Sequence, residues 1–155
     1  MKKILWIHHL QEMWEKGYRD KGTCLETLVE KTAEHIENED YDRIVLTMFE
    51  HWKPQIEHHP LIEVAYSKGL HIEFKEFGYG WSRDMFDEND TTELILGTRD
   101  YHEYDDVIPI EDFLYDFQNN QVDLCGAFLG ECLKDAQTVL EHLNVNFKTL
   151  YNLSV

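Results

Sequence analysis

Short apolar runs alternate along this chain with longer segments whose apolar residues recur at helical spacing. The strand-like runs cover residues 2–9, 42–49, 70–77, 93–98, 122–127 and 147–153. The clearest helical stripes are Leu25, Leu28, Val29, Thr32 and Ile36, and then Leu133, Ala136, Val139, Leu140 and Leu143. Strands that alternate with helices favour a parallel sheet covered on both faces. The pattern therefore predicts a single α/β domain over residues 1–155.

Further local signals define shorter elements. Thr23 and Glu26 form a capping-box pattern, which predicts where the first long helix begins. Residues 60–68 read as a short helix closed by Gly69, and residues 110–119 as another. Within 70–77 charged and apolar residues alternate, which is typical of a strand at the edge of a sheet.

Residues 78–92 show neither the helical nor the strand periodicity of apolar residues. They contain the aromatic residues Tyr79, Trp81 and Phe86. An irregular loop of this length in a compact domain is often a lid or a binding loop. The alternative is that this segment is a disordered connection between two elements.

Residues 122–143 combine a buried strand, a tight turn and a helix. Gly126 and Gly130 mark the turn, and Cys132 falls in the first turn of the helix. Unpaired amide groups and the helix dipole favour a thiolate at such a position, and hence a nucleophile. A buried cysteine that only fills space is the equal alternative.

The residues that follow each strand should lie at one rim of a parallel sheet. Ligands of open α/β sheets bind at this rim. The candidates are His8, His9, Glu50, His51, Arg99 and the turn from Gly126 to Cys132.

Three stretches resemble the isochorismatase-like cysteine hydrolases, the superfamily that includes the nicotinamidases. The segment from Leu124 to Cys132 is similar to that family's strand, glycine turn and nucleophile. The opening from Leu5 to Trp14 resembles its first strand and Asp-x-Gln-x-x-aromatic motif, and residues 43–47 resemble its second strand. The resemblance implies a three-layer α/β/α fold with a six-stranded parallel sheet in the order 3-2-1-4-5-6.

The resemblance also implies a set of site residues. Cys132 would be the nucleophile, His9 stands where the family has its aspartate base, and Arg99 is the nearest candidate for its lysine. An imidazole can accept a thiol proton, whereas a guanidinium offers a fixed charge but carries no proton. A structural histidine after an apolar strand is the alternative for His9. The expected substrate-binding residues are Gln11, Trp14, Ala127, Phe128 and Trp81.

A histidine-rich stretch follows the second strand. His51 matches the histidine of the nicotinamidases' metal pair, but Phe49 stands in place of the aspartate. We expect no cofactor and a solvated loop that contains His58 and His59; a divalent metal near His51 is the alternative.

The composition of the chain excludes several classes of binding partner. The net charge of −17, from 31 acidic and 14 basic residues, repels phosphate backbones, so we expect no nucleic acid partner. No apolar run is long enough for a membrane span. Three cysteines without a disulfide framework fit the reducing cytoplasm. The sequence is compatible with a homo-oligomer.

Two functions remain from this reading, and a third with less support. The first is hydrolysis of a small-molecule substrate with an amide, ester or related carbonyl bond through Cys132. The second is a degenerate, non-catalytic member of the same fold that binds a small molecule or a protein. The third is an acidic inhibitor or mimic that contacts a basic partner.

Overall fold

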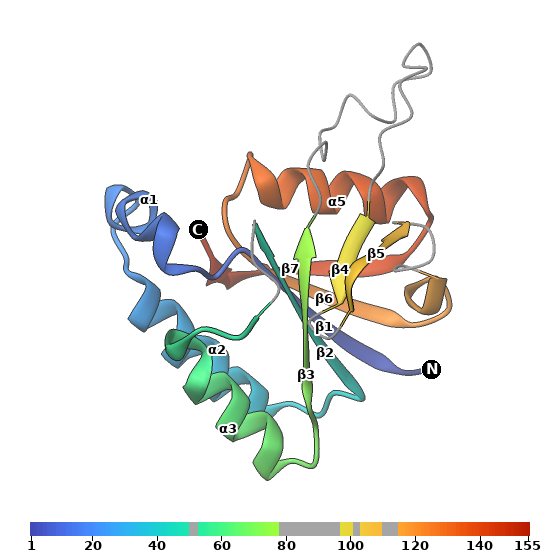
Figure 1. The fold of residues 1–155 in the computed structure, drawn as a ribbon, viewed down its shortest axis with the longest axis horizontal. Helices are drawn as coiled ribbons and strands as arrows, with labels where there is room; N and C mark the ends of the chain where they lie inside the picture. Colours follow the sequence, from blue (N-terminus) through green and yellow to red (C-terminus); the bar gives the residue numbers. More distant parts are fainter. Residues whose placement is uncertain (50–52, 78–96, 101–102, 110–114) are drawn as a thin grey trace.

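The computed structural model describes residues 1–49, 53–77, 97–100, 103–109 and 115–155, which form a mixed sheet with helices on both faces (Figure 1). The strands are β1 (Lys3–His8), β2 (Arg43–Phe49), β3 (Ile72–Phe77), β4 (Gly97–Asp100), β5 (Glu103–Pro109), β6 (Gln121–Gly126) and β7 (Asn146–Ser154). The helices are α1 (Glu15–Asp20), α2 (Leu25–Asn38), α3 (His59–Ser67) and α5 (Cys132–His142). Short 3-10 turns occur at η1 (Glu12–Trp14), η2 (Ile56–His58) and η4 (Tyr115–Phe117).

The sheet order is β5-β4-β3-β2-β1-β6-β7, and five neighbouring strands, from β3 to β7, are parallel. The α/β class and the parallel sheet are confirmed. The prediction of six parallel strands is wrong, because β4 pairs antiparallel with β3 and β5 antiparallel with β4. Counted alone, the parallel strands have the order 3-2-1-4-5.

The predicted fourth strand explains this difference. Residues 93–96 lie outside the described residues, and residues 97 and 98 begin β4 at the outer side of β3. A central parallel strand is buried on both faces and needs a nearly continuous apolar run. The stretch from Gly97 to Asp106 is rich in charged residues, which suits the periphery of a sheet. As a consequence β3, predicted as an edge, has a neighbour on each side.

The sheet separates two apolar cores. On one face Leu5, Ile7 and Leu46 pack with the apolar stripe of α2 and with Leu61 of α3. On the other face Ile4, Trp6 and Val45 pack with the stripe of α5. Both helical stripes predicted from the sequence are buried, apart from partly exposed Leu143.

The start of α2 differs from the capping-box prediction. Cys24 is the N-cap residue, and no side chain caps the helix from that position. The carboxylate of Glu15 instead accepts a hydrogen bond from the Leu25 amide at 2.8 Å. A tertiary contact from α1 therefore satisfies one of the unpaired amides at the start of the helix.

The other predicted helices fare unequally. Residues 60–68 correspond to α3, and Gly69 follows with a φ of +76°. Of the predicted helix 110–119, residues 110–114 lie outside the described residues, and the remainder forms only the single turn η4. The loop at 78–92 also lies outside the described residues.

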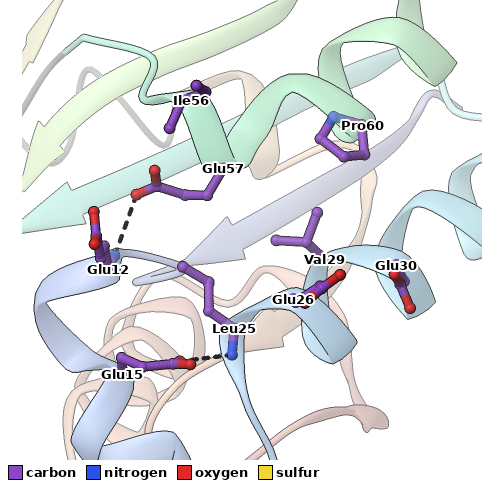
Figure 2. A pocket seen from close by; sticks show the side chains of 9 residues that line it. All are labelled: Glu12, Glu15, Leu25, Glu26, Val29, Glu30, Ile56, Glu57 and Pro60. Atoms are coloured by element: carbon purple, nitrogen blue, oxygen red, sulfur yellow. Dashed lines mark hydrogen bonds between the residues drawn. The ribbon is translucent and has the colours of Figure 1, made fainter.

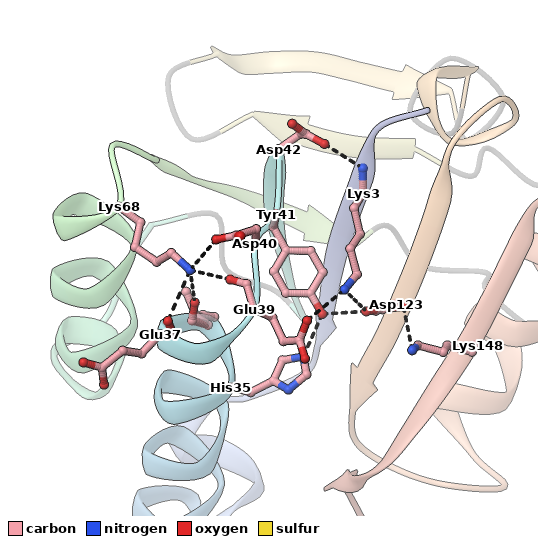
Figure 3. Close-up of polar contacts among 11 residues, drawn as sticks. Lys3, His35, Glu37, Glu39, Asp40, Tyr41, Asp42, Lys68, Asp123 and Lys148 are labelled. Carbon is pink, nitrogen blue, oxygen red and sulfur yellow. Dashed lines mark hydrogen bonds and ion pairs between the residues drawn. The ribbon is translucent and has the colours of Figure 1, made fainter.

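A buried carboxylate on β6 lies beside β1, close to the end of α2 (Figure 3). Asp123 of β6 accepts a hydrogen bond of 2.6 Å from the Tyr41 hydroxyl, and the hydroxyl oxygen faces the His35 ring nitrogen at 2.7 Å. Lys3 and Lys148 approach the carboxylate at 3.8 Å and 3.9 Å. These contacts compensate the cost of burying the charge, which would otherwise be several kcal/mol.

No helix in the described part of the chain has the length and apolar character needed to cross a bilayer.

Candidate functional site

The carboxyl ends of β1, β2 and β6 meet at one rim of the sheet. The His9 amide, just past β1, donates to the carbonyl of Thr47 at 2.9 Å, and the Ala127 amide, just past β6, donates to the carbonyl of His8, also at 2.9 Å. These bonds carry the strand pairing one residue beyond the regular ladder. The residues that follow the strands are thereby held side by side.

Gly126 makes this convergence possible. It has a φ of +124°, and a Cβ atom at this position would lie 1.9 Å from the carbonyl oxygen of His8. Only glycine permits so close an approach of two backbones. The sequence identified Gly126 as a turn residue, and the structure adds the contact with β1.

His9 is buried at the centre of the rim. Its φ of +57° is the left-handed conformation, unusual for a residue other than glycine, asparagine or aspartate. The ring stacks on that of His8 with centroids 3.8 Å apart and faces Trp14 at 6.4 Å. Burial lowers the pKa of His9 to about 3, so the imidazole is neutral at physiological pH.

Tyr18 of α1 holds the loop that carries His9. Its hydroxyl donates to the His9 carbonyl at 2.5 Å and accepts from the Gln11 amide at 3.0 Å. Burial raises the pKa of Tyr18, and the charges of Glu15 and Glu57 contribute to the same shift. Sequence reasoning missed this residue; its only signal was the spacing of four from Trp14, which places both on one helical face.

Gln11 is fully buried and joins the ends of β1 and β2. Its side-chain oxygen accepts from the Phe49 amide at 2.5 Å, and its amide nitrogen donates to the Phe49 carbonyl at 2.8 Å. These two bonds give the side chain a structural role. Contact with a substrate, expected from the resemblance, stays a prediction.

Ala127 and Phe128 are both buried, and Phe128 packs against α1. Its ring lies 5.3 Å from that of Tyr18 and 6.1 Å from that of Trp14. A Cβ atom on Gly17 would come within 2.6 Å of the Phe128 ring, so the glycine leaves room for it. The Phe128 carbonyl accepts from the amides of Glu131 and Leu133, which fixes the turn into α5.

Cys132 is the first residue of α5, as predicted, and is half-buried. Its pKa is raised, first by burial and then by the charges of Asp135 and Glu131. The expectation that the helix N-terminus would favour a thiolate is therefore wrong. Two carboxylates within one turn of the thiol oppose the dipole, which extends only over that turn.

Thr47 connects polar groups beneath the rim. Its hydroxyl accepts from the Trp6 indole at 2.8 Å and lies 2.7 Å from a ring nitrogen of His8. Burial, and then the neighbouring His9, lower the pKa of His8 well below its usual value. Two adjacent imidazoles are thus both held neutral.

His58 also differs from the solvated loop that we expected. It is fully buried in η2, where one ring nitrogen accepts from the Gln55 amide at 3.0 Å and the other lies 2.6 Å from the Leu10 carbonyl. Burial lowers its pKa. The neutral ring thus bridges two backbone segments, whereas His59 is exposed.

Arg99 does not follow a strand adjacent to β1. It lies in β4 opposite Glu76 of β3, three strands from β1, or about 14 Å at the usual strand spacing. The topological reason for grouping it with His9 is therefore wrong. The predicted residues His51 and Trp81 lie outside the described residues.

Among the described residues no group of three or more histidine, cysteine, aspartate or glutamate side chains could hold a metal ion. No family model, no curated protein and no solved structure matches this chain. The candidate site therefore depends on its geometry and on the resemblance read from the sequence.

Proposed function

We propose that this chain is an isochorismatase-like protein that binds a small planar carbonyl compound, such as an aromatic amide, and releases it unchanged at neutral pH. The aromatic cluster at the rim carries the proposal. Its rings belong to His9, Trp14, Phe49 and Phe128, with centroids 5.8 to 6.4 Å apart in neighbouring pairs.

The position of this cluster supports ligand binding. It lies at the carboxyl ends of parallel strands, where open α/β sheets bind ligands. Trp14 and Phe49 are only half-buried, so part of each residue remains accessible to a ligand. Behind them, the Gln11 side chain and the Tyr18 hydroxyl hydrogen-bond to the backbone.

The electrostatics support release without hydrolysis. A thiol whose pKa is raised is mostly protonated at pH 7 and attacks carbonyl carbon slowly. An imidazole with a pKa of about 3 is a weak base toward that thiol. Neither group is tuned for nucleophilic catalysis.

Hydrolysis through a cysteine nucleophile is the second candidate, and the position of Cys132 at the start of α5 favours it. In that reaction the thiol sulfur adds to the carbonyl carbon, its proton passes to neutral His9, and backbone amides hold the oxyanion. The intermediate then collapses, its C–N or C–O bond breaks, and the proton held by His9 passes to the leaving amine or alcohol. Water hydrolyses the resulting thioester, which releases the carboxylic acid and restores the thiol.

Nicotinamide is a suitable probe for separating the candidates. Calorimetric titration should give a measurable Kd for the wild type, a loss of at least about tenfold for Trp14→Ala, and no change for Tyr66→Ala, which removes an exposed ring on α3. Benzamide should give the same order of affinities for the wild type and the two variants.

Ammonia release from the same mixtures decides between the two candidates. Binding without ammonia supports the first. Ammonia release that disappears in Cys132→Ala supports the second. If neither nicotinamide nor benzamide binds and no ammonia forms, both candidates are refuted for planar amides.

A further inference from the structure

We propose that a groove between η1, α2 and η2 docks a basic, amphipathic segment of a partner protein. The groove has a volume of about 440 Å³, and none of the four aromatic residues of the rim cluster lines it. Its apolar lining comprises Leu25 and Val29 of α2, Ile56 of η2 and Pro60 of α3 (Figure 2). The side chain of Ile56 is 81% exposed, which is unusual for a large aliphatic residue.

Every charged residue that lines the groove is a glutamate. Glu12, Glu26 and Glu30 are exposed, whereas Glu15 and Glu57 are half-buried. Figure 2 shows these carboxylates spread around the apolar residues, from elements on both sides of the groove. Among the described residues, no lysine, arginine or histidine lines the groove, and Glu15 pairs with Arg19 from outside it at 3.0 Å.

Two of the five carboxylates stabilise the groove. Glu15 accepts from the Leu25 amide at 2.8 Å, and Glu57 accepts from the Glu12 amide at 3.2 Å. They join α1 to α2 and η2 to η1, so the walls are formed before any partner binds. The remaining three carboxylates are at the surface.

This layout determines the chemistry of the occupant. An apolar side chain of the partner can fill the floor while lysine or arginine residues on either side reach the carboxylates. The overall charge of −17 also accelerates the approach of a basic partner. A folded second copy of this acidic chain would be repelled, and a small cation alone would leave the apolar floor uncovered.

The test uses a fluorescein-labelled peptide with two central leucines flanked by three lysines on each side, measured by anisotropy at 50 mM NaCl. A matched peptide has serines in place of the leucines. We expect the leucine peptide to bind wild-type protein at least about tenfold more tightly than the serine peptide, because two aliphatic side chains are buried.

The acidic contribution is tested with two triple variants of equal net charge. Glu12→Gln, Glu26→Gln and Glu30→Gln together should weaken the leucine peptide by roughly tenfold. Glu37→Gln, Glu63→Gln and Glu141→Gln, at exposed positions outside the groove, should change binding less than about twofold. Circular dichroism and thermal melting verify that all variants fold.

The apolar contribution is tested with Ile56→Ser, which should weaken the leucine peptide and leave the serine peptide unaffected. Equal losses in both triple variants would mean diffuse charge attraction and would overturn the proposal. So would equal binding of the two peptides, or binding of spermine as tight as that of the leucine peptide. Self-association that Ile56→Ser abolishes in sedimentation would assign the groove to a second copy instead.

Discussion

The imidazole of His9 shows how strongly a single buried residue can link stability to pH. Its folded-state pKa is about 3, whereas an unfolded histidine titrates near 6.5. Above about pH 6.5 the ring is neutral in both states and no linkage arises. Below that value the unfolded chain binds a proton that the folded chain excludes, so stability falls as pH decreases toward 3.

We predict that His9→Asn reduces this acid sensitivity. Asparagine tolerates the left-handed φ of +57° and does not titrate. Relative to the variant, the wild type should lose as much as about 2 kcal/mol of unfolding free energy between pH 7.5 and pH 5. Urea unfolding at both pH values measures the difference. Parallel pH profiles would contradict a buried, neutral His9.

The close approach at Gly126 gives a second residue-scale prediction. Gly126→Ala places a methyl group 1.9 Å from the His8 oxygen and should cost at least about 3 kcal/mol, because β1 and β6 must separate. Gly130→Ala is the matched control, since its φ of +78° is also left-handed but the space around it is open. Its cost should be only about 1 kcal/mol. Similar losses in denaturant unfolding would refute the role of the contact.

The residues of the candidate site were only partly predictable. Cys132 and Gly126 carry local signals, a helix start and a turn, and both lie where the sequence placed them. Tyr18 and Thr47 act through partners 9 and 39 residues away, and no local pattern records such contacts. The pKa shift of Cys132 was predicted with the wrong sign, because burial is a property of the whole fold.

At the scale of elements, a lysine from the end of α3 completes the end of α2 (Figure 3). The Lys68 ammonium donates to the carbonyls of Ile36 and Glu37 at 2.9 and 3.3 Å and to that of Glu39 at 2.5 Å. It also lies 3.2 Å from the Asp40 carboxylate. The last carbonyls of a helix lack partners within the helix, and a cation there also interacts favourably with the dipole.

Replacing this lysine should therefore loosen the contact between α2 and α3. Lys68→Met is expected to cost roughly 1 to 2 kcal/mol of unfolding free energy, because it removes charged hydrogen bonds and keeps the aliphatic stem. Lys31→Met, at an exposed position of α2, should change stability by less than about 0.5 kcal/mol. Equal effects in thermal unfolding would argue that Lys68 acts only through its charge.

Elements with strong periodicity were predicted well, and those without it were not. The stripes of α2 and α5 and the runs of β1, β2 and β6 match the structure, because each buries a face that the sequence displays. The segment that includes β4 has no such face. Its pairing with β3 depends on which edge of the sheet is open, and that is decided by the rest of the chain.

At the scale of the molecule, excess negative charge opposes folding. Acidic residues outnumber basic ones by 31 to 14, and compaction brings like charges together. The ion pairs Lys3–Glu39, Arg43–Glu73 and Lys68–Asp40 neutralise only part of this excess. Salt should therefore stabilise the fold by screening repulsion.

We predict that raising NaCl from 20 to 300 mM increases the Tm by several degrees, since about 1 kcal/mol shifts the Tm of a domain this size by a few degrees. The triple glutamine variants, which carry three fewer negative charges, should gain less. Calorimetry at both salt concentrations measures the shift. A Tm that decreases with salt would show that favourable ion pairs dominate instead.

The central position of β1 has one more consequence, for how this chain can change over evolution. Ile4 and Trp6 belong to one core, Leu5 and Ile7 to the other, and the strand pairs with neighbours along both edges. An insertion of one residue within β1 would exchange these two sets and expose each core to side chains shaped for its opposite. Conservative replacements in β1 can be repacked one at a time, whereas a change in its length would disturb both halves of the protein at once.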